Sequence, residues 1–360
     1  MSMKIAVLGG GNGAFAAAAD LTEAGHEVHW WRRNSAGFDA IRNSGGLVVT
    51  DYRGERKVKV QCVNELAQAL AGSTLIVAPV PAFAQTDLAR KLAPHLVNGQ
   101  SVFIPPGTFG AYTMREEIRA RGCHADVAFA ETGTLPWLAR KHGEAHVAIT
   151  TRASRLPTGV YPARAQSLTL DKITQAFPGA IEPVEDALSA ALMNAGPIIH
   201  PPLILMNAGP IEHFDRWDIH NEGTQPSVRA VHDALDAERI AIRTALGYDA
   251  PHYPLADHYL TSNWMYGNLA HDKLVGSGDW HEALNLTNHR YMSEDIRLGL
   301  ALLVSIAEWA KVPCPVANGL LALASAITAD DLRTNGRTLE NLGLASLSQI
   351  ELQTLLKEGR

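Results

Sequence analysis

The sequence has few cysteines, and their arrangement would neither bind a metal nor build a disulfide framework. Its three cysteines, Cys62, Cys123 and Cys314, lie far apart, and no two of them form a CxxC pair. Such sparse, scattered cysteines are typical of a reducing compartment and favour neither structural disulfides nor a zinc site. We therefore expect a cytoplasmic protein that holds no metal.

Long apolar runs and an excess of positive charge are also missing. The formal net charge of the 360 residues is -6, which offers a nucleic acid no basic surface. The longest apolar run, 298–310, contains Ser305 and Glu308 and is shorter than the roughly 20 residues that cross a bilayer. Near the N-terminus the apolar stretch 5–8 leads directly into glycines, which fits a strand and turn better than a secretory signal. We expect neither nucleic acid nor a membrane among the partners of this chain.

The first half of the chain contains a regular alternation of two kinds of segment. Short runs rich in β-branched and aromatic residues predict strands at 4–8, 27–31, 74–78, 101–104 and 126–130. The stretches between them predict helices at 14–24, 64–71, 85–96 and 112–121. Strands that alternate with helices are joined by crossovers, so we expect a parallel sheet with helices on both faces.

The first predicted strand runs into a glycine cluster with the spacing of a dinucleotide-binding loop, G-x-G-x-x-A. Gly9 permits the tight turn, Gly11 lets the backbone approach a pyrophosphate, and Ala14 lets the next helix pack closely. The motif alone could be a flexible turn, but its place on the first strand of the alternating half predicts a Rossmann domain. We assign to the cofactor site Gly9, Gly10, Gly11, Asn12, Gly13, Ala14, Val80 and Pro81.

The second predicted strand ends in Arg32 and Arg33, where NAD-dependent proteins usually carry an acidic residue for the adenosine ribose. A guanidinium can bind a 2′-phosphate through two parallel hydrogen bonds, whereas a carboxylate would repel it. We therefore predict that NADP(H) is the preferred cofactor and that NAD(H) is possible. The alternative is that both arginines are ordinary solvated charges at a strand end.

The pattern changes to helices alone after about residue 185. Apolar residues recur at helical spacing in 228–246, and the stretches 298–310 and 320–328 are apolar almost all round. A chain of 360 residues has room for two domains. We expect an α/β fold, with a Rossmann doubly wound parallel sheet over 1–184 followed by an all-α domain over 185–360.

Longer segments of the chain resemble the opine dehydrogenases, the octopine/nopaline dehydrogenase group, and are especially similar to its bacterial N-(1-carboxyethyl)norvaline branch. The glycine motif is common to many dehydrogenases, whereas the His-Pro and Arg-Tyr-x-x-Glu-Asp segments are much more specific. The resemblance covers essentially the whole length and rests on VLGGGNGAFA at 7–16, ETGTLP at 131–136, NAGPIIHPP at 194–202, AERIAI at 237–242, LNLTNHRYMSEDI at 284–296 and RTLENLGL at 337–344.

This resemblance implies an enzyme that couples the amino group of an amino acid to a 2-oxo acid and reduces the resulting imine with a nicotinamide hydride. It also implies a helical second domain of the 6-phosphogluconate dehydrogenase-like type, a homodimer, and a catalytic His–Asp pair that matches His200 and Asp295 here. The chain departs from the norvaline branch at Arg32, where that branch has Asp. The usual NAD preference of the family is therefore not carried over.

The expected chemistry fits this pair of residue types. Imine formation needs a group that exchanges a proton near neutral pH, and a buried Asp on the far ring nitrogen would fix the tautomer of a His. From the sequence pattern alone, we would interpret His200 as a packing residue and Asp295 as an acidic residue in the first turn of a helix. Weaker candidates for holding a substrate carboxylate or carbonyl are Thr134, Asn194 and Arg290.

Other interpretations stay open at this point. The polar cluster at 213–220 around Trp217 could be drawn as a metal site, although an irregular surface loop is the expectation. The chain could be a ketopantoate-reductase-like or 2-hydroxyacid dehydrogenase that uses no amine, and amine dependence of turnover would distinguish it. It could also be a non-catalytic NADP(H)-binding regulator, against which the retention of His200 and Asp295 argues.

Overall fold

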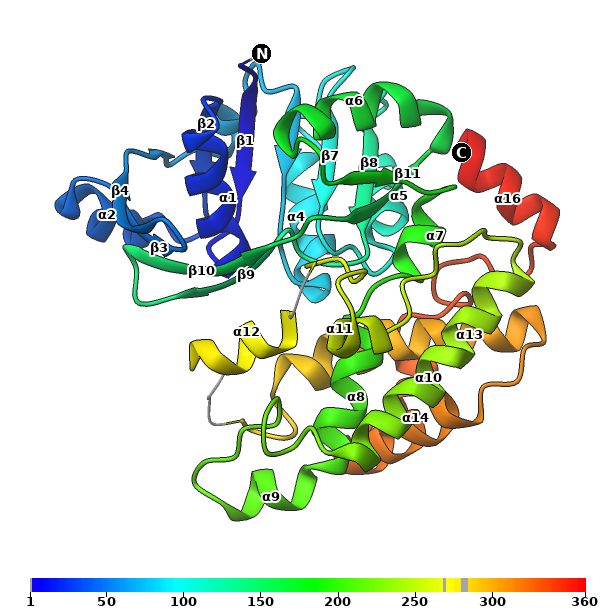
Figure 1. The fold of residues 1–360 in the computed structure, drawn as a ribbon. Coiled ribbons are helices and arrows are strands. Elements are labelled where there is room, and N and C mark those ends of the chain that lie inside the picture. Colours follow the sequence, from blue (N-terminus) through cyan, green and yellow to red (C-terminus); the bar gives the residue numbers. More distant parts are fainter. Residues whose placement is uncertain (1, 268–269, 280–283) are drawn as a thin grey trace. The chain divides into compact units, whose positions relative to one another are not determined.

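The computed structural model describes residues 2–267, 270–279 and 284–360. The chain divides into two compact units, one comprising Met1–Ala191 with Leu356–Arg360 and the other Leu192–Leu355 (Figure 1). The expected boundary at 184/185 lies slightly before this division, and the C-terminal residues pack with the first unit instead of the second. Each unit is described by itself below.

An eight-stranded sheet forms the centre of the first unit, in the order β12-β11-β8-β7-β6-β1-β2-β5. Its strands are β1 (Lys4–Leu8), β2 (Glu27–Trp31), β5 (Gln61–Val63), β6 (Leu75–Val77), β7 (Ser101–Ile104), β8 (Ala128–Thr132), β11 (Leu156–Tyr161) and β12 (Ile181–Pro183). All neighbours run parallel except β8 and β11, which are antiparallel. The predicted parallel sheet is confirmed from β5 to β8, and β11 and β12 extend it beyond the prediction.

Helices cover both faces of this sheet (Figure 1). The helical segments of the unit are α1 (Asn12–Glu23), η1 (Ser35–Gly37), α2 (Phe38–Ser44), α3 (Leu66–Leu70), η2 (Ala82–Ala84), α4 (Gln85–Leu92), α5 (Gly110–Ala120), η3 (Ala163–Ala165), α6 (Gln166–Ala176) and α7 (Ala187–Ala191). Residues of α1 and α6 share one hydrophobic cluster with strands of the sheet, whereas α4 and α5 pack against each other.

A second sheet of four strands, which the sequence did not lead us to expect, covers the outer side of α1. It has the order β4-β3-β10-β9 and consists of β3 (Leu47–Asp51), β4 (Gly54–Val58), β9 (Trp137–Lys141) and β10 (His146–Arg152). Strand β4 is mostly exposed and rich in charge, so it lacks the apolar run that marks a buried strand. Because α1 is enclosed by both sheets, its alanines are completely buried, and small side chains suit that tight space.

All regular elements that the structure describes between 192 and 355 are helical, which confirms the expected all-α second half. They are α8 (Gly196–Met206), α9 (Ala208–His213), α10 (Pro226–Ala245), α11 (Ala256–Leu260), α12 (Ala270–Ser277), the π-helix η4 (Tyr291–Leu300), α13 (Ala301–Ala310), α14 (Pro315–Thr328), α15 (Leu332–Asn335) and the start of α16 (Gln349–Glu358). The single helix expected at 298–310 is in fact the end of η4 followed by α13.

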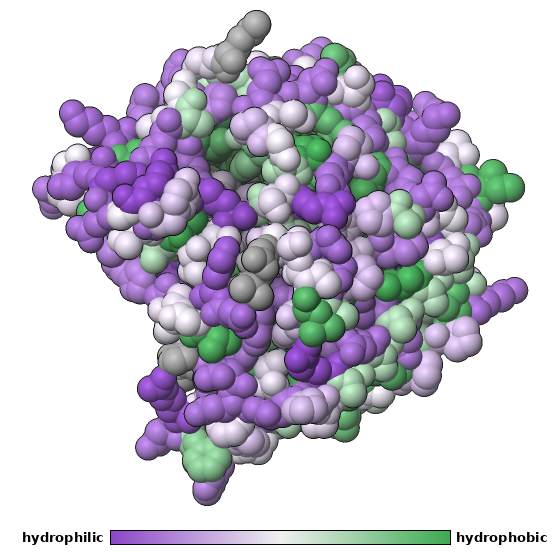
Figure 2. Space-filling view, in the orientation of Figure 1, coloured by the Kyte–Doolittle hydropathy of each residue, from purple (hydrophilic) through white to green (hydrophobic). Residues whose placement is uncertain are grey.

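One helical stretch in the described part of the chain, Ala187–Met206, is long and apolar enough by composition to cross a membrane. Within its most apolar window 83% of the residues are buried inside the protein, as in a core helix. On the face of the molecule in Figure 2, hydrophilic side chains are interspersed with single hydrophobic ones. The stretch therefore gives no more than weak evidence for a membrane span.

Candidate active site

The glycine loop lies where the chain order of the large sheet reverses, since β1 has β2 on one side and β6 on the other. This is the position at which α/β sheets bind nucleotides. Gly9 has φ +131°, a conformation that favours glycine, and its N–H donates to Trp31 O at 2.9 Å. Trp30 Nε1 donates to Gly9 O at 2.8 Å, so the end of β2 is held against the loop.

The space around the loop fits the pyrophosphate of a dinucleotide. A Cβ added to Gly11 would meet no atom within 4 Å, and the start of α1 has no side-chain cap that would compete with an anion. At Gly13, by contrast, a Cβ would lie 2.9 Å from Pro79 Cβ, so only glycine allows this contact. Val80 Cγ1 lies 3.5 Å from the Cβ position of Gly9, which places Val80 beside the loop, and Pro81 is the next residue in the chain.

The two arginines after β2 differ in their surroundings. The Arg32 side chain is largely buried, and its Nη1 lies 2.6 Å from Glu144 Oε2. The Arg33 side chain is 81% exposed and lies 3.7 Å from Asp87. The alternative that both arginines are solvated charges at a strand end therefore suits the exposed Arg33 but not the buried Arg32. Lys141, which the sequence did not single out, lies 3.0 Å from the same Glu144.

In the second unit, His200 on α8 and Asp295 on η4 face each other. His200 Nδ1 lies 2.8 Å from Asp295 Oδ2, although the two residues are far apart in the sequence. Both side chains are mostly buried, so the interaction between them is only weakly screened by water. The structure therefore brings together the two residues that the family resemblance predicted as a pair.

Two glycines let the helices that carry this pair approach closely. A Cβ on Gly196 would overlap the Asp295 carboxylate, and a Cβ on Gly299 would overlap the ring of Pro197. Residues of η4 follow a π-helix, a form that is frequent at functional sites. The close contact of α8 and η4 thus depends on the absence of side chains at positions 196 and 299.

Tyr291 and His220 complete the surroundings of His200, and sequence reasoning missed the first and misplaced the second. The ring of Tyr291 stacks on the His200 imidazole with centroids 3.7 Å apart and an angle of 11°. Its hydroxyl lies 3.2 Å from His220 Nε2. His220 and Asp218 are buried, so the expectation of a surface loop is wrong at these two residues. A tyrosine within RYMSEDI was the only signal in the sequence for this stacking.

The surroundings of the Asp295 carboxyl shift its pKa. Burial raises the pKa of the Asp295 carboxyl, and the positive charges of Arg290 and His289 oppose this rise.

The predicted substrate residues Asn194 and Arg290 belong to this same unit. Asn194 Oδ1 accepts a hydrogen bond from Gly196 N at 3.1 Å, at the start of α8.

The third predicted substrate residue, Thr134, is a buried residue of the first unit, where its carbonyl oxygen accepts a 2.5 Å hydrogen bond from Thr132 Oγ1. Among the described residues no group of three or more His, Cys, Asp or Glu side chains could hold a metal ion.

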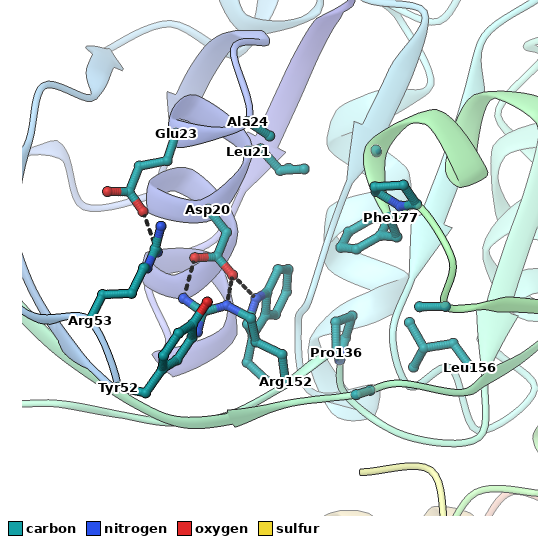
Figure 3. A pocket seen from close by; sticks show the side chains of 15 residues that line it. Asp20, Leu21, Glu23, Ala24, Tyr52, Arg53, Pro136, Arg152, Leu156 and Phe177 are labelled. Atoms are coloured by element: carbon teal, nitrogen blue, oxygen red, sulfur yellow. Dashed lines mark hydrogen bonds and ion pairs between the residues drawn. The ribbon is translucent and has the colours of Figure 1, made fainter. Parts of the chain in front are cut away.

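A cavity of about 330 Å³ in the first unit lies at the far end of α1 from the glycine loop (Figure 3). One wall carries Asp20, Glu23 and Arg53, and another carries apolar side chains such as Phe177. Arg152 donates two hydrogen bonds to Asp20, at 2.6 and 2.7 Å, and Arg53 donates one to Glu23 at 2.7 Å. The charged side chains of the cavity are thus paired with one another. We therefore interpret the cavity as part of the packing between α1 and the second sheet and not as a ligand site.

Comparisons with known proteins agree with this geometry. A family model described as NAD/NADP octopine/nopaline dehydrogenase, alpha-helical domain, matches residues 183–328, which include His200 and Asp295. A second model, the NAD-dependent glycerol-3-phosphate dehydrogenase N-terminus, matches residues 4–105. The opine dehydrogenase of Arthrobacter sp. (strain 1C) is 28% identical over 368 aligned positions, which cover 99% of each chain.

Two solved dehydrogenase structures have a fold similar to that of this chain. Octopine dehydrogenase in complex with NADH and agmatine matches with a TM-score of 0.75 and 18% identity, covering 100% of this chain and 98% of that one. Yersinopine dehydrogenase with NADP+ bound matches with a TM-score of 0.68 and 16% identity, covering 99% and 98%.

A parallel sheet with a glycine loop, joined to a helical domain of this type, defines an NAD(P)-dependent oxidoreductase. The matches to the helical-domain model and, over the full length, to an opine dehydrogenase narrow this class further. The chain is thus similar to the opine dehydrogenases of the octopine/nopaline dehydrogenase group.

Proposed function

We propose that this chain catalyses the reductive condensation of a 2-oxo acid with the amino group of an amino acid. The observation that carries the proposal is the His200–Asp295 pair, 2.8 Å apart within the region that matches the helical-domain model. A His held by a buried carboxylate can donate and accept a proton near neutral pH. Reductive condensation needs such a group, because water must leave before the carbon–nitrogen bond can be reduced.

We assign the two side chains complementary roles in this reaction. The amine nitrogen adds to the oxo carbon, and His200 Nε2 then protonates the hydroxyl of the resulting carbinolamine, so that water leaves and an iminium forms. Asp295 accepts the Nδ1–H of His200, which fixes the tautomer and stabilises the imidazolium. A bound nicotinamide supplies the hydride that reduces the iminium carbon to the secondary amine.

We further propose NADP(H) as the preferred cofactor, with NAD(H) as a possible second one. The support is the position of Arg32, a guanidinium beside Gly10 at the end of β2, with Lys141 close by. One structure of similar fold binds NADH and another binds NADP+, so we expect individual side chains to determine which cofactor is preferred.

Arg32→Asp should shift the preference towards NADH. An unchanged ratio of the affinities for NADPH and NADH would show that Arg32 does not determine the preference.

The finer points of substrate and assembly are also proposals. Asn194 precedes His200 and Arg290 precedes Asp295 by a few residues in the sequence. Both are proposed to hold a substrate carboxylate or carbonyl, and Thr134 is a further candidate. We also propose that the protein is a cytoplasmic homodimer.

A matrix of 2-oxo acids against amines tests the proposed reaction. The panel includes pyruvate, norvaline, arginine and agmatine, each with NADPH and with NADH, and oxidation of the cofactor is followed by absorbance. We expect turnover only where an oxo acid and an amine are both present. Undiminished oxidation without any amine would favour a ketopantoate-reductase-like or 2-hydroxyacid enzyme. Tight cofactor binding with no turnover across the panel would favour a regulator.

A further inference from the structure

A glutamate from the turn between β9 and β10 lies against two cations, Arg32 after β2 and Lys141 at the end of β9. Glu144 Oε2 lies 2.6 Å from Arg32 Nη1, and its Oε1 lies 3.0 Å from Lys141 Nζ. This turn is fixed to the glycine loop, because Asn12 Oδ1 accepts a hydrogen bond from Lys141 N at 3.0 Å. The cluster of Arg32, Lys141 and Glu144 therefore lies beside the residues that face the cofactor.

The surroundings hold the Arg32 guanidinium in one position. A Cβ on Gly10 would lie 3.0 Å from Arg32 Nε, and a Cβ on Gly37 would overlap both the guanidinium and the Glu144 carboxylate. The rings of Phe15 and Phe38 lie 6.0 and 5.8 Å from Arg32 Cζ, within the range of cation–π attraction. An arginine confined in this way is preorganised to bind an anion.

Exposure and charge show which member of the cluster can leave. The side chains of Arg32 and Lys141 are 10% and 20% exposed, whereas that of Glu144 is 45% exposed. Hydrogen bonds from Arg32 and Lys141 hold the pKa of Glu144 below its ordinary value, so it is an anion at neutral pH. Two fixed cations thus surround one carboxylate that can turn out into solvent.

We propose that Glu144 selects the cofactor by competing with the 2′-phosphate of NADP(H) for Arg32 and Lys141. With NAD(H) the carboxylate stays in place and accepts hydrogen bonds from the ribose hydroxyls. With NADP(H) it must leave, because a phosphate and a carboxylate would repel each other between the same two cations. Glu144 therefore weakens NADP(H) binding below what the two cations alone would give. This inference rests on the dinucleotide binding proposed above.

Titration of Glu144→Gln with NADPH and with NADH tests the inference. Losing the competing charge should tighten NADPH binding by about tenfold and weaken NADH binding severalfold. The matched control is Glu212→Gln, which removes an exposed carboxylate on α9 and should leave both dissociation constants unchanged. An unaltered NADPH/NADH ratio in Glu144→Gln overturns the inference.

Failure of the inference and failure of the proposed function give different results. If the unsubstituted protein binds neither dinucleotide, the proposed function fails, whatever Glu144 does. A crystal structure with 2′,5′-ADP gives a second readout that needs no variant. We expect the phosphate on Arg32 and Lys141 with Glu144 displaced, and an intact Arg32–Glu144 ion pair with the phosphate elsewhere would contradict us.

Discussion

At the scale of single residues, His200 is held on two sides. Asp295 binds its Nδ1 at 2.8 Å, and the Tyr291 ring stacks on its face at 3.7 Å. These contacts leave the imidazole little freedom to rotate, so in the proposed reaction they determine which nitrogen exchanges a proton. A side chain fixed in this way is expected to matter more for turnover than for stability.

We predict that His200→Ala lowers turnover by about 10²- to 10⁴-fold, the usual contribution of a positioned proton donor. The affinity for NADPH should stay nearly unchanged, because the glycine loop belongs to the other unit. Steady-state rates and a cofactor titration measure the two effects. The control is His213→Ala, which replaces an exposed histidine on α9 and should leave both the turnover rate and the affinity for NADPH nearly unchanged. Loss of both turnover and cofactor binding would identify His200 as a structural residue.

At the scale of elements, the contact between α8 and η4 decides whether the proposed catalytic pair, His200 and Asp295, can form. Gly299 lies against Pro197, and Gly196 lies against Asp295, with no room for a Cβ at either glycine. On helical propensity alone, alanine would be better than glycine at position 299. The retained glycine is therefore explained by packing and not by local preference.

We predict that Gly299→Ala destabilises the helical unit by about 1–3 kcal/mol, because the added methyl group overpacks the contact with Pro197. It should also lower turnover by displacing Asp295. Gly319→Ala on α14 is the matched control, since a Cβ there meets no atom within 4 Å, and it should be neutral or stabilising by about 0.4–1 kcal/mol. Urea unfolding of both variants measures the difference, and equal effects would refute the packing argument.

The second sheet contains a buried carboxylate that should make it sensitive to acid. Burial opposes the charge of Asp51, but hydrogen bonds from Arg56, Arg53 and Arg152 outweigh it and hold the pKa well below the ordinary 3.8. A lowered pKa stabilises the folded state above the ordinary value, and this contribution is lost as the pH falls below about 4.

We predict that Asp51→Asn costs about 1–3 kcal/mol at pH 7, less than a fully buried ion pair because its arginines are partly exposed. The difference from the unsubstituted protein should shrink as the pH is lowered to about 3. Urea unfolding at both pH values measures this change. A difference that does not depend on pH would mean that shape, and not charge, explains the cost.

At the scale of the whole molecule, the chain leaves the first unit near Ala191 and returns to it at Leu356. Leu356 is completely buried, Arg164 Nε donates to Glu358 O at 3.0 Å, and Arg360 lies 3.6 Å from Glu116. The C-terminus thus completes the first unit, although it comes last in the sequence.

We predict that Leu356→Ala destabilises the protein by about 2–4 kcal/mol, the usual cost of a large-to-small change in a core. Ile350→Ala on the same helix is the control, because Ile350 is 76% exposed, and it should change stability by less than about 0.5 kcal/mol. Thermal unfolding with and without NADPH measures both variants. Equal melting temperatures for the two variants would show that the C-terminus is not part of a core.

The strands of the large sheet could be predicted where their residues are buried on both faces. The ranges of β1, β2 and β7 agree with the prediction, because short runs rich in β-branched and aromatic residues between turn residues favour strands. The second sheet could not be predicted, since β4 is a charged, exposed strand whose existence depends on pairing with β3. The same holds for Tyr291, whose contact with His200 joins residues far apart in the sequence.

The sequence by itself determined the glycine loop, the alternation of strands and helices, and the helical second half, because each of these is a local pattern of residues. Only the tertiary structure decided that Arg32 meets Glu144 and Lys141, and that His200 meets both Asp295 and Tyr291. The reason is physical: side chains from distant segments interact only once packing has fixed their backbones, and periodicity in one segment carries no information about its partner.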